Sequence, residues 1–274
     1  MRPILATGPQ AVLSRDGACA PDASRASRPV PVLLPHARSA RMVRRNDEEV
    51  VMSKLQQPSA APPVVERAAF DAALADQVRD EKELTRHGDR VSAARRRLPM
   101  VPVDDYAFDG PDGPVHLTEL FGDRYLLLVQ NVMYSADWDD ACPSCTWAID
   151  DLPADMGRLD DESIAFAMVS EAPVEKLEQW RTQQGWPHRW VSSGATSYHG
   201  DWGWTVHHDD WDGPVPGYSY YLLRDGVPYL TYATTARGTE AIQPVAHVMD
   251  RTAYGRQQDW EDSPEGWPQY PTYG

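Results

Sequence analysis

The sequence predicts an α/β fold in which a central mixed sheet carries helices on both faces. Two strand–helix units indicate it: apolar runs at 125–133 and 164–169 are each followed by a helix-compatible stretch. A third indication is a later hairpin, in which strands at 218–223 and 227–232 flank an Asp225-Gly226 turn. This alternation, followed by an antiparallel pair, is typical of a mixed sheet covered on two sides.

Two segments precede the predicted sheet. Residues 1–63 are rich in Pro, Ala, Ser and Arg without a sustained period, which predicts a disordered tail. An ordinary start sequence begins at Met52, so we interpret residues 1–51 as an upstream extension without a folded role. Residues 64–98 carry apolar side chains at three- and four-residue spacing, which predicts a helical extension. We expect it to divide at Gly88 and to pack on the core or on a partner chain, such as the second copy of a homodimer.

The sheet domain is predicted over residues 99–260, followed by a C-terminal tail at 261–274. Pro near the start and Gly at the end mark its second helix, because Pro is tolerated in a first turn and Gly favours a helix terminus. In order, the predicted elements are extended segments at 101–108 and 115–117 around a turn at 110–113, a helical turn at 118–122, the strand at 125–133, a helix from about Cys145, the strand at 164–169, a helix from Pro173 to Gly185, an extended segment at 190–193, the hairpin, and a last helix at 238–248.

Charge and cysteine count limit the function. The net charge is −15, with +3 on residues 1–51 and −18 on the remainder, so the body would repel phosphates and we expect no nucleic-acid partner. No run of 18 apolar residues is present, so we expect no membrane span, and Gly8, Pro9 and Gln10 interrupt the first apolar residues before a signal sequence forms. We therefore expect a cytoplasmic protein, where a close cysteine pair is more often catalytic or metal-binding than a structural disulfide.

Two of the three cysteines lie in Cys142-Pro143-Ser144-Cys145, between a predicted strand and a predicted helix. Unpaired N–H groups and the macrodipole at a helix N-terminus stabilise a thiolate. A CxxC motif in this context indicates thioredoxin-like redox chemistry. We expect Cys142 to face solvent as the nucleophile and Cys145, one turn into the helix, to be the resolving thiol. Pro143 suits the first helical position, and Ser144 can tune the potential through its N–H and hydroxyl groups.

Four residues just ahead of the motif bear on its reactivity. Asp139 and Asp140 would either oppose a thiolate by repulsion or cap the N-terminus of the same helix. Asp137 and Trp138 are expected to shape the rim of the site. Three later tryptophans would either pack a loop or line an apolar substrate pocket: Trp202, Trp204 and Trp211.

The sequence contains five short segments whose order resembles that in the bacterial DUF899 family, described as thioredoxin-like predicted dithiol-disulfide oxidoreductases. The segments are EKELTR at 81–86, FDGPDG at 108–113, Asp137-Trp138, CPSC at 142–145 and ARG at 236–238, and the resemblance covers about residues 65–260. It implies a thioredoxin-like fold, a central mixed sheet flanked by helices, with an N-terminal helical extension. It implies no particular substrate.

A proline is the candidate for a second feature of thioredoxin-like proteins. These proteins place a cis-proline opposite the CxxC motif, before the next antiparallel strand. Val215-Pro216-Gly217 precedes the strand at 218–223, which makes Pro216 the nearest candidate. An ordinary trans loop proline is the alternative.

The sequence therefore predicts a thiol-disulfide oxidoreductase that needs no cofactor, with Cys142 attacking and Cys145 resolving. Its substrate would be a protein or small-molecule disulfide, and an unidentified reductant partner would complete the cycle. A peroxiredoxin-like peroxidase is the alternative enzyme. It requires Cys142 to react with peroxide, usually beside a Ser or Thr, for which Ser135 is the candidate.

A non-enzymatic copper- or zinc-binding module on the same fold is the third hypothesis. The CxxC pair supplies half of a tetrahedral zinc site, and thiolates with imidazole also suit copper. Because Cys19 lies in the predicted tail, the further ligands would be His199, His207 and His208. A His pair in a loop rich in Trp and Asp is more often polar surface than a ligand set.

Overall fold

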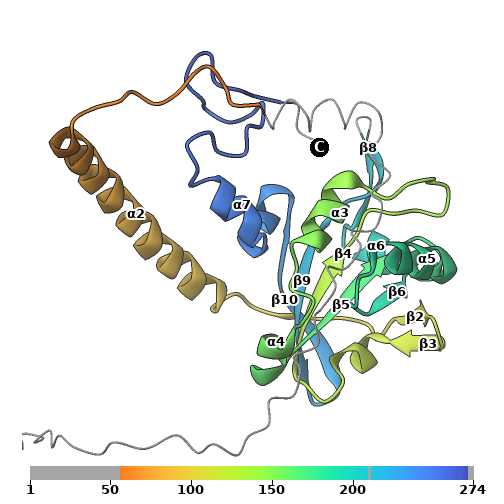
Figure 1. Cartoon of the computed structure of the whole chain (residues 1–274). Coiled ribbons are helices and arrows are strands. Elements are labelled where there is room, and N and C mark those ends of the chain that lie inside the picture. Colours follow the sequence, from red (N-terminus) through yellow and green to blue (C-terminus); the bar gives the residue numbers. More distant parts are fainter. Residues whose placement is uncertain (1–55, 209–210, 271–274) are drawn as a thin grey trace, which may run out of the picture. The chain divides into compact units, whose positions relative to one another are not determined.

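An eight-stranded sheet with helices on both faces organises the chain (Figure 1). The computed structural model describes residues 56–208 and 211–270, so the segment 1–51 and Cys19 lie outside the described residues. The strand order is β1-β10-β9-β4-β5-β6-β2-β3. The bounds are β1 Val101–Pro102, β2 Ala107–Gly110, β3 Gly113–His116, β4 Leu126–Asn131, β5 Ile164–Ser170, β6 Trp190–Ser192, β9 Gly217–Arg224 and β10 Val227–Thr235.

The four central strands have thioredoxin-like connectivity. β4 and β5 are parallel neighbours joined through α3 (Pro143–Asp150) and the short α4 (Gly157–Asp161). β9 runs antiparallel to the other side of β4 and turns through Asp225-Gly226 into β10, which α7 (Pro244–Met249) follows. β6 and the β2–β3 hairpin extend this unit at one edge, and β1 extends it at the other. The predicted α/β class and the thioredoxin-like arrangement are confirmed.

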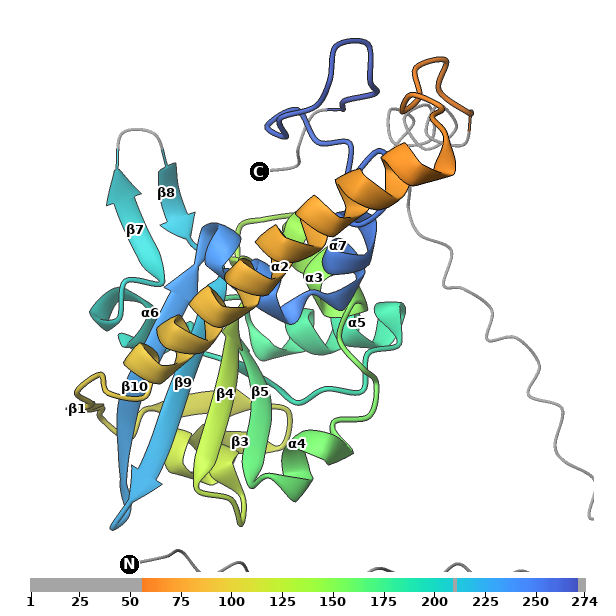
Figure 2. The same ribbon diagram turned by 90° about the vertical axis from the view of Figure 1, so that its left-hand side faces the viewer.

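Two hydrophobic cores occupy the two faces of the sheet, because side chains alternate along each strand. On one face α3 and α5 (Val174–Gln184) cover Met168 and Trp190. On the other face the 3-10 helix η1 (Leu117–Phe121) and α6 (Tyr198–Asp201) cover β4 and β5. Figures 1 and 2 both show α7 beside α3. The central strands are thus buried on both sides, which is why they are almost continuously apolar in sequence.

The N-terminal extension is a single helix, α2 (Arg67–Arg95), and not two. Gly88 continues it, since a lone Gly costs a helix only about 1 kcal/mol relative to Ala. None of its 29 residues is buried, so the helix does not lie in the core, and packing on a partner chain stays a prediction. At its C-terminal end the Arg95 guanidinium lies 4.6 Å from the centre of the Tyr232 ring. Within the described residues no helix, α2 included, is both long and apolar enough to cross a membrane.

Several elements differ from the prediction. The last helix is divided into η2 (Ala236–Ile242) and α7, because Pro244 lacks the N–H that would continue a helix and instead begins a new one. A second, two-stranded sheet pairs β7 (Thr205–His208) with β8 (Trp211–Pro214), in a stretch whose Trp, His and Asp content conceals the alternation. The helices α4 and α6 were missed because they are too short to leave a periodic signal.

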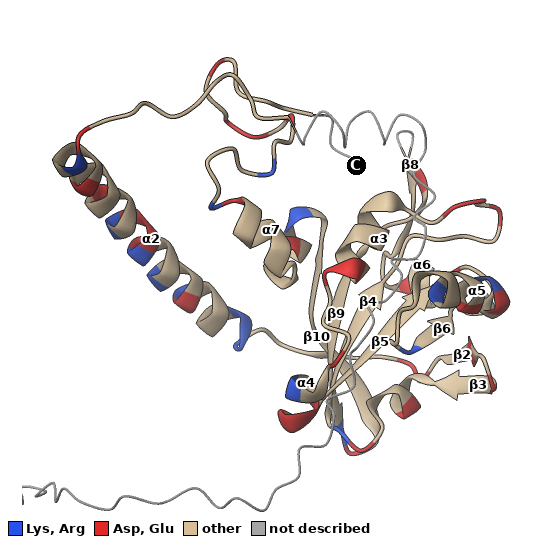
Figure 3. Ribbon diagram, in the orientation of Figure 1, with Lys and Arg blue, Asp and Glu red and all other residues tan. Residues whose placement is uncertain are grey.

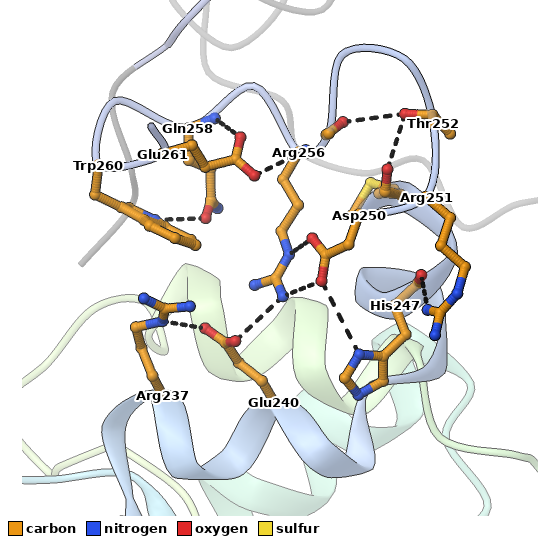
Figure 4. Close-up of polar contacts among 12 residues, drawn as sticks. Arg237, Glu240, His247, Asp250, Arg251, Thr252, Arg256, Gln258, Trp260 and Glu261 are labelled. Carbon is orange, nitrogen blue, oxygen red and sulfur yellow. Dashed lines mark hydrogen bonds and ion pairs between the residues drawn. The ribbon is translucent and has the colours of Figure 1, made fainter. Parts of the chain in front are cut away.

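An ion-pair network ties the C-terminal segment to η2 and α7 (Figure 4). Arg256, which is 7% exposed, donates to both carboxylate oxygens of Asp250, at 2.6 and 2.7 Å, and to Glu240 at 3.1 Å. Glu240 also accepts from Arg237 at 3.0 Å, and the Arg237 guanidinium stacks 3.9 Å from the centre of the Trp260 ring. The buried Arg256 guanidinium is therefore matched by two carboxylates, as burial of a cation requires.

We expect Gly217→Ala to destabilise the fold. A Cβ at Gly217 would lie 2.5 Å from the Thr234 carbonyl oxygen and would overlap the buried Trp204 ring. Overpacking of this kind costs about 1–3 kcal/mol, so thermal unfolding should show a Tm several degrees lower. Gly88→Ala is the matched control, because its Cβ would meet no atom within 4 Å and Ala favours a helix. Equal Tm values for the two variants would contradict this packing.

Candidate dithiol site

The CxxC motif forms the N-terminus of α3. Cys142 is the N-cap and Pro143 the first helical residue, where the missing N–H of proline costs nothing. The Cys142 carbonyl accepts hydrogen bonds from the Thr146 N–H and hydroxyl, both at 3.0 Å. The N-cap position considered for Asp139 or Asp140 is therefore held by Cys142.

Both thiols are buried, and neither is in a disulfide. Cys142 is 7% exposed and Cys145 is 4% exposed, so the expectation that Cys142 faces solvent is wrong. The reason is the apolar cluster in which they lie, built from α3, α5 and the ends of β4, β5 and β6. Its other buried members are Val132, Tyr134, Ile149, Met168, Ala172, Leu177, Trp180, Trp186 and Trp190. A substrate must therefore pass between large side chains to reach the sulfur of Cys142.

The two thiols have pKa values shifted in opposite directions. The pKa of Cys142 is lowered to about 6, first by a hydrogen bond from the Cys145 side chain and then, against the effect of burial, by the N–H groups of Cys145 and Ser144 and the Ser144 hydroxyl. The pKa of Cys145 is raised well above its ordinary value by the same hydrogen bond, by burial and by the charge of Cys142. The net effect on Cys142 is thus activation.

Three buried polar atoms at or beneath α3 have no hydrogen-bond partner among the described residues: Gln130 Oε1, Asp151 Oδ2 and the Tyr218 hydroxyl. Gln130 and Tyr218 are paired in register on β4 and β9, so they share the face that α3 covers. Burial raises the pKa of Tyr218, and charge at Tyr220, Cys145 and Asp151 raises it further. Burial also raises the pKa of Asp151. Sequence analysis missed these three residues, because a strand pattern does not show which polar residues will lie beneath a helix.

Lys176 of α5 fixes the loop that leads to the motif. Its ammonium donates to the carbonyl oxygens of Ser135 and Ala136, each at 3.2 Å, and to that of Trp138. It also lies 4.5 Å from the centre of the Tyr134 ring. Sequence analysis missed this residue, and its rarity, as one of three lysines in the chain, was the available signal.

We call residues 134–141, between β4 and α3, the acidic loop. The Cys142 N–H donates to the Met133 carbonyl at 3.2 Å and thereby closes it. Its three carboxylates, Asp137, Asp139 and Asp140, are exposed, and Figure 3 shows the acidic stretch of chain that precedes α3. The loop thus holds a cation on its inner side and presents negative charge on its outer side.

Trp138 connects the acidic loop to the β7–β8 hairpin. It packs against the cluster that contains the cysteines, and its ring meets Trp211 of β8 edge to face, with 5.9 Å between centroids. Trp204 is instead buried beside Gly217, and the Trp202 indole donates to the Tyr106 hydroxyl at 3.2 Å. The structure brings Trp138 and Trp211 together near the dithiol, and the roles of Trp138 at the rim and of Trp211 in a substrate pocket stay predictions.

Pro216 lies at the same end of the sheet as the dithiol, but its peptide bond is trans. Gly217 pairs with Asn131, the last residue of β4, and the chain continues from there toward Cys142. The predicted cis-proline is therefore wrong. A trans bond is the ordinary state of an X–Pro peptide, and the Thr235 hydroxyl donates to the Pro216 carbonyl at 2.5 Å.

The three histidines do not gather at the dithiol. His199 is 1% exposed in α6, on the opposite face of the sheet, with Nδ1 2.6 Å from the Ser193 hydroxyl, and burial lowers its pKa to about 3. His207 and His208 are exposed on β7, where His207 pairs with Asp212. In the described part of the chain no group of three or more His, Cys, Asp and Glu side chains could hold a metal ion. Those residues therefore do not complete the four-ligand zinc site.

Sequence comparison identifies the family. The family model described as "Bacterial protein of unknown function (DUF899)" matches residues 59–273. The chain belongs to the DUF899 family. The resemblance noted from the five short segments is thereby confirmed. No curated protein matches the sequence.

Solved structures similar to this DUF899 protein include a cysteine mutant of PrxQ from Xylella fastidiosa, with 8% identity, TM-score 0.43, and 56% of this chain and 97% of that chain covered. Peroxidoxin BcpB from Mycobacterium tuberculosis is 12% identical, with a TM-score of 0.41, and the match covers 54% of this chain and 97% of that chain. A mutant of peroxiredoxin Q from Xanthomonas campestris is 15% identical, with a TM-score of 0.39, and the match covers 53% of this chain and 91% of that chain. These identities and TM-scores are too low to indicate the chemistry of this chain. The fold assignment therefore rests on the strand order described above.

We expect the Cys142 thiolate of the DUF899 protein to form at lower pH than an ordinary cysteine. With a pKa of about 6, most of Cys142 is ionised at neutral pH, and the ultraviolet absorbance of thiolate in a Cys19→Ser background should rise through a midpoint near 6. Cys145→Ala should move the midpoint upward, because it removes the donor with the largest effect. A midpoint near 8.5, the value of a free cysteine, would contradict the assigned hydrogen bonding.

Lys176→Met should loosen the acidic loop while preserving the packing of the aliphatic stem. Loss of hydrogen bonds from a charged donor costs about 1.5–3 kcal/mol, so denaturant unfolding should occur at lower concentration. Amide exchange measured by mass spectrometry should accelerate over residues 134–141. Arg181→Met is the control on the same helix, because Arg181 binds Glu178 and not the loop. Unchanged exchange in the Lys176 variant would show that the ammonium does not hold the loop.

Proposed function

We propose that this protein is a thiol-disulfide oxidoreductase whose reactive group is the Cys142/Cys145 pair. The observation that carries the proposal is the position of the pair at the N-terminus of α3, where the Cys145 thiol and the first N–H groups of the helix lower the pKa of Cys142 while the pKa of Cys145 is raised. A dithiol reductant needs this difference, because the attacking sulfur must be a thiolate at neutral pH while the second sulfur waits as a thiol. In more general terms, we propose a redox role that depends on these thiols.

In the proposed reaction the Cys142 thiolate attacks one sulfur of a substrate disulfide. The substrate S–S bond breaks, a mixed disulfide forms with Cys142, and the first substrate thiolate departs. Cys145 then loses its proton to the medium and attacks the Cys142 sulfur, which releases the second substrate thiolate and leaves a Cys142–Cys145 disulfide. Two electrons have passed from the dithiol to the substrate, and a dithiol donor must return them by the reverse exchange. The substrate is a protein or small-molecule disulfide, and no cofactor takes part.

Burial of Cys142 favours one alternative, a thiol peroxidase. The sulfur of a residue that is only 7% exposed is more easily reached by hydrogen peroxide than by the S–S bond of a folded protein. The Cys142 thiolate would attack one peroxide oxygen, break the O–O bond and become a sulfenic acid, while the other oxygen leaves as water or an alcohol after protonation. Cys145 would then condense with the sulfenic acid to give the same disulfide and water.

The test compares three cysteine variants in insulin reduction with a thiol donor and in peroxide consumption. Cys142→Ser should abolish disulfide reduction, Cys145→Ser should accumulate a mixed disulfide at Cys142 visible by mass spectrometry, and Cys19→Ser should retain activity. Rapid peroxide consumption with a sulfenic acid at Cys142, and no insulin reduction, would favour the peroxidase. Failure to form the Cys142–Cys145 disulfide under mild oxidant would exclude both.

A further inference from the structure

A pocket of about 280 Å³ lies at the end of the sheet opposite to the dithiol. It is bounded by the segments that lead into three parallel strands: 120–124 before β4, α4 with the residues ahead of it before β5, and 187–189 before β6. Figures 1 and 2 both show α4 and α3 at opposite ends of β4 and β5. Its volume is close to the lower limit for ligand pockets, about 300 Å³, which suits a small molecule.

Part of the pocket wall is apolar. Four side chains from four different segments form it: Leu120, Met156, Phe166 and Pro187. Leu120 belongs to the core on one face of the sheet, and Phe166 packs against the cluster on the other face. Because packed cores fix these two side chains, the wall is formed before any ligand binds.

His188 is a buried polar residue of the same wall. It is 7% exposed, and its ring meets Phe166 edge to face, with 5.4 Å between centroids. Among the described residues, neither ring nitrogen of His188 has a hydrogen-bond partner, and burial lowers its pKa. The ring is therefore neutral at physiological pH and has one N–H to donate. A buried N–H without a partner is unfavourable in a folded protein, so His188 is suited to donate to a ligand.

Two arginines of the wall carry positive charge, and only one of them is neutralised. Arg124 forms ion pairs with Asp160, at 2.9 Å, and with Asp123, at 3.1 Å. Arg189 forms no ion pair with a described carboxylate, and its guanidinium donates instead to the Glu119 carbonyl at 3.3 Å. Outside residues 1–51 the chain has a net charge of −18, so an unpaired cation in a pocket is a local exception. It favours the binding of one negative charge.

We propose that this pocket binds a small organic anion with one carboxylate and an apolar body. Arg189 holds the carboxylate, because the planar guanidinium matches its two oxygens, and the adjacent His188 N–H donates a further hydrogen bond. The apolar body lies against Phe166 and its neighbours in the wall. A dianion such as phosphate fits less well, because the wall offers one unpaired cation and also contains the carboxylate of Asp160. This binding site is independent of the proposed dithiol reaction.

The experiment titrates the full-length protein with three probes by isothermal titration calorimetry. Benzoate has both a carboxylate and an apolar ring, benzamide keeps the ring without the charge, and acetate keeps the charge without the ring. We expect benzoate to occupy one site per chain with a dissociation constant in the millimolar range or below. Benzamide and acetate should each bind about tenfold or more weakly, because one loses the charged hydrogen bonds and the other loses the apolar burial.

Two variants and a matched control assign the binding to this pocket. Arg189→Met removes the unpaired charge and should weaken benzoate binding about tenfold or more. Arg158→Met is the control, because Arg158 of α4 is exposed, pairs with Glu162 and does not line the pocket. His188→Phe keeps an aromatic ring beside Phe166 and should weaken binding by a smaller factor. Circular dichroism checks that each variant is folded, and we expect this of Arg189→Met because Arg189 is exposed.

Three results would overturn the inference. The first is the lack of saturable benzoate binding at concentrations well above the millimolar range. The second is equal affinity for benzoate and benzamide, which would leave the pocket without a preference for an anion. The third is equal weakening by Arg189→Met and Arg158→Met, which would indicate general attraction by surface charge. None of them bears on the proposed function, because reduction of insulin by the dithiol does not use this pocket.

Discussion

The hydrogen bond from the Cys145 thiol to the Cys142 sulfur is the interaction on which the chemistry of this site depends. Burial alone would raise the pKa of both thiols, and two cysteines three residues apart would then be equally unreactive. The bond removes that symmetry, because one sulfur donates and the other accepts. The N-terminus of α3 adds to the difference, since its free N–H groups face Cys142 and not the residue one turn further along. Acidity and burial can therefore coexist at Cys142.

The fold holds this bond in place from two sides. Beneath it, β4 and β5 are parallel and buried on both faces, so the strand end from which α3 departs cannot shift without disturbing two cores. Above it, the acidic loop is closed at its base by the Cys142 N–H and held from α5 by Lys176. A free loop of this composition would be spread by repulsion among its carboxylates. The ammonium on its inner side opposes that repulsion and satisfies carbonyl groups that would otherwise need water.

The sequence predicts the sheet well because its signal is local. Apolar runs predict β4 and β5, and the CxxC spacing locates the junction between strand and helix. The Asp225-Gly226 pair predicts the β9–β10 hairpin, because both residues readily adopt the positive φ that the turn requires. The features that were missed depend on residues far apart in the chain. Lys176 reaches the loop across about 40 residues, and Tyr218 comes beneath α3 only through its register with Gln130. The exposure of Cys142 was predicted wrongly for the same reason, since the aromatic cover comes from α5 and β6.

The same asymmetry bears on the direction of electron transfer in the proposed reaction. An acidic thiol stabilises the reduced form of a dithiol, because only the reduced form contains a thiolate. Because the pKa of Cys142 is lowered to about 6, most of the reduced protein contains this thiolate at neutral pH. This stabilisation makes the couple more oxidising than one with ordinary thiols. In the same direction, the Cys142 hydrogen bond, burial and the charge of Cys142 raise the pKa of Cys145, so the proton that Cys145 must lose is held tightly. Formation of the internal disulfide is therefore the step that the surroundings of the site resist, in equilibrium as well as in rate.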